Sequence, residues 1–488
     1  MKLFLKLLTL SSLNFAIFAE IYNFPSNFVW GAASASYQIE GAWNVDGRIP
    51  SIWDTASHKN NSSVVDGSTG DDAAMSYYYY EKDIQALKDI GFKTYRFSIA
   101  WPRVLTKTNQ VNQAGIDYYS KLIDRLKEEE IKPMVTMYHW DLPQYLQDLG
   151  GWTNPAIVKY FEHYADTLYK HFGDRVKEWI TFNEPATFCD GGYSWGWHAP
   201  EIRTEKQIGG YLCSHHILLA HGAAYHLYKN KYFADQQGKV GICLNTGYSF
   251  PANENVTDEH VDRAMHFGLG RYANPIYSVD GDYPRVMREA IDQKSTDEGR
   301  RWSRLPHFTT AQVESLHGAA DFLALNYYTS SLIQPYSHLG WNPADSDSEI
   351  HSFHDDNWKR SSSSWLVSVP EGLYHLLLWI KDNYNNPLVY ITENGWSDLP
   401  MTIEDDGRVE YLREHLAAMS RAITDGCRVE TYTVWSLTDN FEWMRGYTER
   451  FGIYAINFTD PERKRIPKNS VDLMKQVVRD NFVEVEKD

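Results

Sequence analysis

The chain has 488 residues, of which 43% are hydrophobic and 23% are charged, as in ordinary globular proteins. Its net charge of −17 argues against a nucleic-acid partner, because a protein that binds a phosphate backbone needs an excess of Lys and Arg. The length permits either one large domain with long loops or about two or three smaller domains.

Residues 1–19 have the pattern of a secretory signal peptide. Lys2 and Lys6 supply positive charge, residues 3–18 are mostly apolar, and Ala19 offers a small residue for cleavage. A membrane anchor is the alternative, but the apolar segment is short and interrupted by polar residues, and no later segment is long enough to span a bilayer. We therefore expect no membrane partner and a secreted, extracellular protein, with a gut lumen as one location.

The sequons and the cysteines fit secretion. N-glycosylation sequons occur at Asn60, Asn61, Asn255 and Asn457. The cysteines Cys189, Cys213, Cys243 and Cys427 are too few for a disulfide framework; one disulfide is allowed, and the sequence does not choose among the pairings. No pair of Cys or His residues has metal-ligand spacing, so we expect neither a metal nor a cofactor.

Eight apolar, β-branched segments alternate with helical patterns along the chain. Strands are predicted at residues 28–35, 94–100, 134–138, 178–182, 240–245, 322–327, 388–392 and 431–436. The clearest helices are predicted at residues 80–90, 115–130 and 155–172, the last ending near Gly173. Residues 253–258 are predicted to form a turn before a helix, and residues 333–369 an extended loop beside the active-site mouth. The alternation predicts an α/β fold, a single (β/α)8 TIM barrel over residues 20–488, with long loops at its C-terminal face.

Two glutamates lie where predicted strands end. Glu393 follows the apolar residues 388–390, and Glu184 follows residues 179–182. In a TIM barrel the C-terminal ends of the strands surround the active site, so both carboxyl groups are expected to face the barrel mouth. Glycoside hydrolysis needs such a pair, because one group protonates the leaving oxygen while the other attacks or stabilises the anomeric carbon.

Seven segments in a fixed order make this interpretation specific. They are FVWGAASASYQIEG at 28–41, YRFSIAW at 95–101, HWDLP at 139–143, TFNEP at 181–185, LNYYT at 325–329, ITENG at 391–395 and WSLTDNFEW at 435–443. Through them the chain resembles glycoside hydrolase family 1, the β-glucosidase family, over nearly all of residues 20–488. The segment RGYTERFG at 445–452 makes it most similar in appearance to secreted insect β-glucosidases and myrosinases.

The resemblance implies a role for each glutamate. Glu393 would be the nucleophile that forms a glycosyl-enzyme ester, and Arg96 and the Tyr328 hydroxyl would keep it ionised. Glu184 would be the acid/base, protonated at first because burial and the Glu393 charge raise its pKa. Once Glu393 is esterified, the pKa of Glu184 should fall, and Glu184 would deprotonate the incoming water. The implied outcome is retention of configuration, with carboxyl groups about 5–5.5 Å apart.

The resemblance also implies a set of substrate-binding residues, which combine planar hydrogen-bonding groups with aromatic rings. The set is Gln38, His139, Asn183, Asn326, Tyr328, Trp435, Glu442 and Trp443. Asn183 would contact the sugar 2-hydroxyl, and Gln38 and Glu442 would bind the distal hydroxyls. The bulky Trp195, Trp197 and His198 in the loop after Glu184 are expected on the aglycone side.

The sequence leaves three main functions open, and transglycosylation to an alcohol acceptor through the same covalent intermediate is a fourth interpretation. The first is a retaining β-glucosidase that hydrolyses oligosaccharides or plant defence glucosides. The second is a thioglucosidase, myrosinase-like, that hydrolyses glucosinolates; plant members carry glutamine in place of Glu184, and Arg203, Arg271 and Arg445 are candidates for binding a sulfated aglycone. The third is a non-catalytic sugar-binding protein on the same fold. In each case the partner is a small-molecule β-glucoside, and the sequence does not decide between a monomer and a homo-oligomer.

Overall fold

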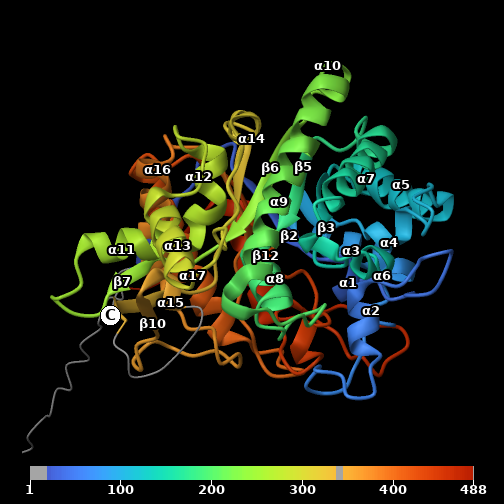
Figure 1. Cartoon of the computed structure of the whole chain (residues 1–488). Helices are drawn as coiled ribbons and strands as arrows, with labels where there is room; N and C mark the ends of the chain where they lie inside the picture. Colours follow the sequence, from blue (N-terminus) through green and yellow to red (C-terminus); the bar gives the residue numbers. More distant parts are fainter. Residues whose placement is uncertain (1–18, 337–344, 487–488) are drawn as a thin grey trace, which may run out of the picture.

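Eight parallel strands close into a barrel in the computed structural model, which describes residues 19–336 and 345–486 (Figure 1). The strands are β2 (Val29–Ala33), β3 (Thr94–Ser98), β4 (Lys132–Tyr138), β5 (Glu178–Asn183), β6 (Lys239–Asn245), β8 (Phe322–Asn326), β11 (Val389–Glu393) and β12 (Val429–Trp435). Their order around the barrel is β11-β12-β2-β3-β4-β5-β6-β8. The eight predicted strands are confirmed, and their ends differ from the predicted ends by two residues or fewer.

The barrel strands are apolar because both of their faces are buried. Every residue of β3, β8 and β11 is buried, which is typical of parallel strands that are covered by helices outside and side chains inside. The apolar cluster inside the barrel consists of Met134, Ile180, Cys243, Phe322, Ala324, Leu388 and Tyr390. These side chains fill the barrel, so polar chemistry is confined to its C-terminal mouth.

Helices surround the barrel (Figure 1). The longer ones are α3 (Ser76–Ile90), α5 (Gln113–Glu128), α7 (Ile157–Phe172), α9 (Ile208–Leu227), α13 (Arg285–Asp297), α16 (Pro370–Asn383), α17 (Asp406–Thr424) and α18 (Asn469–Asp480). The three predicted helices correspond to α3, α5 and α7, and α7 is followed directly by Gly173. In the described part of the chain, no helix combines the length and the apolar character needed to cross a membrane.

Shorter helices connect the barrel units. They are α1 (Ser36–Ile39), α2 (Ile52–Ser57), α4 (Trp101–Val104), α6 (Gln144–Asp148), α8 (Pro185–Tyr193), α10 (Phe233–Gln236), α11 (Asp258–Met265), α12 (Arg271–Tyr277), α14 (Thr310–Leu316) and α15 (Asp345–Ser348). Residues 1–18 of the predicted signal peptide lie outside the described residues. Its last residue, Ala19, begins β1 (Ala19–Asn23), which pairs antiparallel with β15 (Phe482–Glu486).

The prediction of one extended loop over residues 333–369 is wrong in part. This segment contributes to β9 (Ser331–Pro335) and contains α15 and β10 (Ile350–Phe353), and β9 lies between β10 and β7 (Ser249–Pro251) in a small sheet. Ile333 and Ile350 are buried in this sheet, but polar neighbours and Pro335 hide the alternation that would have predicted a strand. Residues 337–344 lie outside the described residues. The turn predicted at residues 253–258 is confirmed, because α11 begins at Asp258.

A single disulfide joins Cys189 of α8 to Cys213 of α9, which answers the pairing that the sequence left open. The two cysteines are 24 residues apart, and a loop of this size stabilises a fold by about 3 kcal/mol in the chain-entropy model. Cys243 and Cys427 are free and buried. Because α8 starts directly after Glu184, the disulfide holds the helix that carries this glutamate.

Candidate active site

The two predicted glutamates lie at the C-terminal ends of the barrel strands. Glu393 is the last residue of β11. Glu184 is the first residue after β5 and the N-cap of α8, so it follows the strand at its C-terminal end, as predicted. The strand stops at Asn183 because Glu184 has a left-handed backbone, with φ 50° and ψ 60°. Glu184 therefore leaves the sheet, and its side chain is placed at the barrel mouth.

A cleft of about 520 Å³ opens at this mouth. It is lined by Ser63, Val65, His139, Trp140, Asn183, Glu184, Thr187, Trp197, His198, Asn245, Tyr328, Trp365, Glu393, Trp435, Glu442, Trp443, Met444, Arg445, Glu449 and Phe451. The remaining predicted residues, Gln38, Arg96 and Asn326, are buried and hydrogen-bond to Glu442, Glu393 and Glu184, respectively. The structure thus brings the whole predicted set together.

Glu393 is held by one cation and one hydroxyl. Arg96 Nη1 lies 2.7 Å from Oε1 of Glu393, and the Tyr328 hydroxyl donates to Oε2 at 2.6 Å. Burial raises the pKa of Glu393, while Arg96, Tyr328 and Asn326 oppose that rise. Because both Glu393 and Arg96 are buried, their ion pair strongly favours the ionised form of the carboxyl group.

Within the described residues, the hydrogen-bond donors to the Glu184 carboxyl group are neutral. Asn326 Nδ2 donates to Oε1 at 2.7 Å, and the Thr187 hydroxyl donates to Oε2 at 3.1 Å. Burial, and then the nearby Glu393 charge, raise the pKa of Glu184 to about 8. The raised pKa of Glu184 favours its protonated form near neutral pH, and the ion pair with Arg96 favours the ionised form of Glu393, which is the division between an acid and a nucleophile.

Hydrogen bonds orient the polar groups of the predicted substrate-binding residues. Gln38 Nε2 donates to the carbonyl of Phe441 at 3.0 Å and to Oε2 of Glu442 at 3.3 Å. Asn183 Nδ2 lies 3.1 Å from His139 Nε2, and burial lowers the pKa of His139 well below its usual value. Among the described residues, Gln38 Oε1 and His139 Nδ1 are buried without hydrogen-bond partners. Sugar hydroxyls are suitable partners for both atoms.

Aromatic rings form one wall of the cleft. His139 stacks on Trp435 and on Trp443 with ring centroids 5.8 and 5.9 Å apart, and Trp140 lies 4.6 Å from Trp443. Trp140 and Trp443, like Glu184, have positive φ, at 77° and 50°. Bulky residues adopt this backbone rarely, at a cost of about 1–3 kcal/mol each, and three such residues around one cleft are typical of a functional site.

The other expectations for the mouth are met in part. Trp197 and His198 line the cleft, whereas Trp195 is not among its lining residues. Of the three candidate arginines, only Arg445 lines the cleft within the described ranges. Arg271 instead forms a buried ion pair with Asp190 at 2.8 Å.

Several cleft residues were not predicted from the sequence. They are Ser63, Val65, Trp140, Thr187, Asn245, Trp365, Met444, Glu449 and Phe451. Five of them had a usable signal: Asn245 ends a predicted strand, Thr187 follows Glu184 by one helical turn, and Trp140, Glu449 and Phe451 lie inside the segments HWDLP and RGYTERFG. Met444 lies in the short 3-10 helix Trp443–Arg445. Ser63, Val65 and Trp365 lie on loops, whose positions at the mouth the local sequence does not determine.

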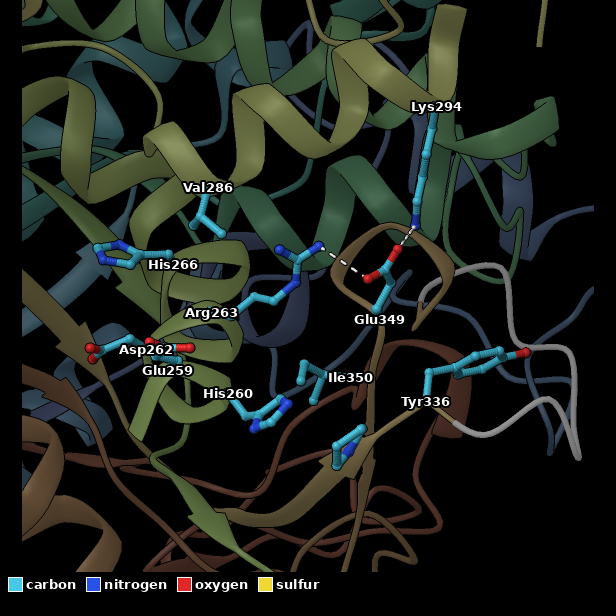
Figure 2. Close-up of a pocket in the computed structure, with 11 residues that line it drawn as sticks. Glu259, His260, Asp262, Arg263, His266, Val286, Lys294, Tyr336, Glu349 and Ile350 are labelled. Carbon is cyan, nitrogen blue, oxygen red and sulfur yellow. Dashed lines mark ion pairs between the residues drawn. The ribbon is translucent and has the colours of Figure 1, made fainter. Parts of the chain in front are cut away.

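A larger pocket of about 970 Å³ lies on the surface between α11, α13 and β10 (Figure 2). Its Glu349 forms ion pairs with Arg263 and Lys294, drawn as dashed lines in the figure. The pocket contains neither Glu184 nor Glu393, so the smaller cleft holds the chemistry. Over residues 19–336 and 345–486, no cluster of three His, Cys, Asp or Glu side chains is arranged to hold a metal ion.

Comparisons with known proteins agree with the geometry of the cleft. The family model for glycosyl hydrolase family 1 matches residues 21–483. Myrosinase 1 of Brevicoryne brassicae is 44% identical over 94% of this chain and 98% of its own, and human cytosolic β-glucosidase is 42% identical over 94% and 99%.

Solved structures give the same result. An aphid myrosinase superposes with a TM-score of 0.90 at 44% identity, over 94% of this chain and 99% of that chain. A rice β-glucosidase superposes with a TM-score of 0.86 at 40% identity, over 93% and 99%. The paired carboxyl groups, the closed barrel and these matches together show that the chain belongs to glycosyl hydrolase family 1 and is a glycoside hydrolase of the β-glucosidase type.

Proposed function

We propose that the protein is a retaining β-glucosidase that hydrolyses β-D-glucosides through a covalent glycosyl-enzyme intermediate. The observation that carries this proposal is the different environment of the two glutamates. Glu393 pairs with Arg96 and Tyr328, Glu184 has neutral partners and a raised pKa, and the Asn326 side chain interacts with both. One carboxyl group is thus ready to attack while the other is ready to give a proton.

In the first step a Glu393 oxygen attacks the anomeric carbon, and the bond from that carbon to the aglycone oxygen breaks. Glu184 gives its proton to the departing oxygen, so the aglycone leaves as a neutral alcohol. Gln38 and Glu442 hold the distal hydroxyls, and the aromatic wall of Trp435 and Trp443 contacts the ring.

In the second step water replaces the aglycone. Esterification removes the charge of Glu393, which is the second-largest cause of the raised pKa of Glu184. The pKa of Glu184 therefore falls, and its carboxylate takes a proton from the water that attacks the anomeric carbon. The ester bond breaks, Glu393 regains its charge, and the sugar leaves with its original configuration.

The pH dependence of the first step follows from Glu184 and Glu393. Glu184 acts only when protonated, so kcat/KM is expected to fall by about tenfold per pH unit above its pKa of about 8. On the acid side kcat/KM is expected to fall where Glu393, whose pKa burial raises, takes up a proton and can no longer attack. A pH profile of kcat/KM on an aryl β-glucoside from pH 4 to 10 measures both limbs. If kcat/KM had already fallen to its alkaline minimum at pH 6, the assignment of Glu184 as the acid would be contradicted.

The function is tested by kcat/KM on a matched panel of an aryl O-glucoside, cellobiose, a cyanogenic glucoside and a glucosinolate. A preference for O-linked members supports the β-glucosidase. Absence of turnover on the whole panel, with retained sugar binding, would instead support a non-catalytic sugar-binding protein.

Thioglucosidase activity is a second candidate, favoured by the position of Arg445 in the cleft and by the name of the aphid relative. Arg445 is 43% exposed and lies 3.3 Å from Glu449, so it can offer a charge to a sulfated aglycone. If glucosinolates are substrates, Arg445→Gln should raise their KM by about 3–10-fold and leave the KM of a neutral aryl glucoside unchanged. An equal change for both substrates would remove this candidate.

We also propose that the protein is a secreted glycoprotein. The signal-peptide pattern and the Cys189–Cys213 disulfide support an oxidising compartment. All four sequon asparagines, Asn60, Asn61, Asn255 and Asn457, are exposed. Treatment of protein from the medium of expressing eukaryotic cells with an N-glycosidase should lower its mass; an unchanged mass, or protein found only inside the cells, would contradict the proposal.

A further inference from the structure

One free cysteine lies directly beneath the candidate acid/base. Cys243 is fully buried on β6, where it belongs to the apolar cluster inside the barrel and pairs in register with Asn183 of β5. Its backbone carbonyl accepts a hydrogen bond from the backbone N–H of Glu184 at 2.9 Å. Cys243 therefore connects the apolar interior of the barrel to Glu184, whose backbone is left-handed and whose carboxyl group is the candidate acid/base.

The thiol of Cys243 contacts a polar group of the site. Its Sγ donates to Oδ1 of Asn326 at 3.0 Å, and the Thr392 hydroxyl donates to the same oxygen at 2.8 Å. Burial, and to a lesser degree the charges of Glu393 and Glu184, raise the pKa of the thiol to about 12, so it keeps its proton and remains a donor. Two donors therefore converge on one oxygen of the Asn326 amide.

These donors determine which way the Asn326 amide faces. With Oδ1 held by Cys243 and Thr392, Nδ2 points to the other side, where it donates to Glu184 Oε1 at 2.7 Å and to Asn183 Oδ1 at 3.1 Å. Rotation of the amide by 180° would turn Oδ1 toward two acceptor oxygens. The orientation is reinforced at Asn183, whose Oδ1 also accepts from Arg96 Nη2 at 2.5 Å.

We propose that Cys243, together with Thr392, is a positioning residue that fixes the Asn326 amide so that its NH2 group donates to the acid/base Glu184. The proposal rests on the role of Glu184 in the proposed function. Neither residue touches the cleft; both act through Asn326.

The consequence is a lower pKa for Glu184 than burial alone would give. A donated hydrogen bond stabilises the carboxylate, and Asn326 is the largest of the influences that lower this pKa. The titratable and charged groups that act on Glu184 are Glu393 on β11, Arg96 on β3, Cys243 on β6, Tyr328 after β8, and Glu442 after β12. The Cys243 thiol is uncharged near neutral pH, so its replacement removes a donor to Asn326 without removing a charge, and the other four groups are retained in sequence; a shift can therefore be assigned to the amide.

The test compares Cys243→Ala with Cys243→Ser on an aryl β-glucoside. The alanine variant removes a donor and should move the alkaline limb of kcat/KM upward by about 0.5 pH unit, and the double variant Cys243→Ala/Thr392→Val by about 1 unit. The serine variant keeps a donor and should return the limb to the wild-type position. Cys427→Ala is the matched control, because Cys427 is the other free, buried cysteine of the described chain and precedes β12 at the opposite end of the barrel.

The outcomes separate positioning from packing. The proposal would be overturned if the alkaline limb of kcat/KM lay at the same pH in Cys243→Ala and the wild type. It would also be overturned if the alanine and serine variants shifted that limb by the same amount. If Cys243→Ala does not fold, Thr392→Val tests the same amide and must shift the limb upward. If the wild type hydrolyses no glucoside, the proposed function fails, and the titration of Glu184 followed by carbon NMR of the resting protein still tests the amide: its pKa must rise in Cys243→Ala and not in Cys427→Ala.

Discussion

Glu393→Gln is expected to abolish turnover of O-glucosides and S-glucosides alike, with a loss of roughly 10⁴-fold or more in kcat. The neutral amide cannot form the glycosyl ester, and Arg96 and Tyr328, which now face the carboxylate at 2.7 and 2.6 Å, lose their anionic partner. Because both substrate classes need the same nucleophile, a good leaving group should give no protection. Initial rates on an aryl glucoside, cellobiose and a glucosinolate measure the effect.

Glu178→Gln is the matched control for this substitution. Glu178 begins β5 at the opposite end of the barrel, and burial also raises its pKa, so the same chemical change is made far from the cleft. Its kcat should remain within about twofold of the wild type. Residual activity of Glu393→Gln above about one hundredth of wild type on either substrate class would contradict the nucleophile assignment.

Glu184→Gln is expected to discriminate between substrates. Loss of a general acid lowers rates by about 10²–10⁴-fold where the leaving group needs a proton, so cellobiose should be affected most. Activated aryl and thio leaving groups depart without protonation, and their first step should be spared. The glycosyl-enzyme then accumulates, since no base activates the water, and a burst of aglycone release should precede slow turnover.

Added azide completes this experiment, because it attacks the glycosyl-enzyme without a general base. Azide should restore turnover of the activated aryl glucoside by Glu184→Gln and yield a β-glucosyl azide, with no effect on Glu393→Gln. If all substrates slowed equally and azide changed nothing, Glu184 would not be the acid/base.

The barrel could be predicted from the sequence because its strands are buried on both faces and therefore read as continuous apolar segments. Glu393 was placed correctly at the end of β11 for this reason. The strand β9 was not predicted. Ile333 is followed by Gln334 and Pro335, so the alternation of apolar and polar residues is too short to indicate a strand. Glu184 was likewise expected where the fourth strand ends, and it follows β5 directly; its left-handed backbone could not be predicted, because that conformation leaves no mark on residue type.

The candidate site was predictable where residues fall inside recognisable segments and not where loops meet. Trp365 and Met444 line one cleft although 79 positions separate them, and only the fold brings them together. The Cys189–Cys213 pairing depends on how α8 packs against α9. The role of Cys243 depends on its contact with the side-chain oxygen of Asn326. Both are properties of three-dimensional contacts between distant segments.

Because of the disulfide between α8 and α9, the range of substrates that the enzyme hydrolyses is expected to depend on the redox conditions under which it folds. It anchors the helix that starts after Glu184, whereas Glu393 is held within the barrel by Arg96. Protein made in a reducing compartment would therefore keep a well-placed nucleophile and a less well-placed acid. Such a preparation would still cleave activated aryl glucosides while losing cellobiose, so the ratio of the two rates would report the oxidation state of a batch.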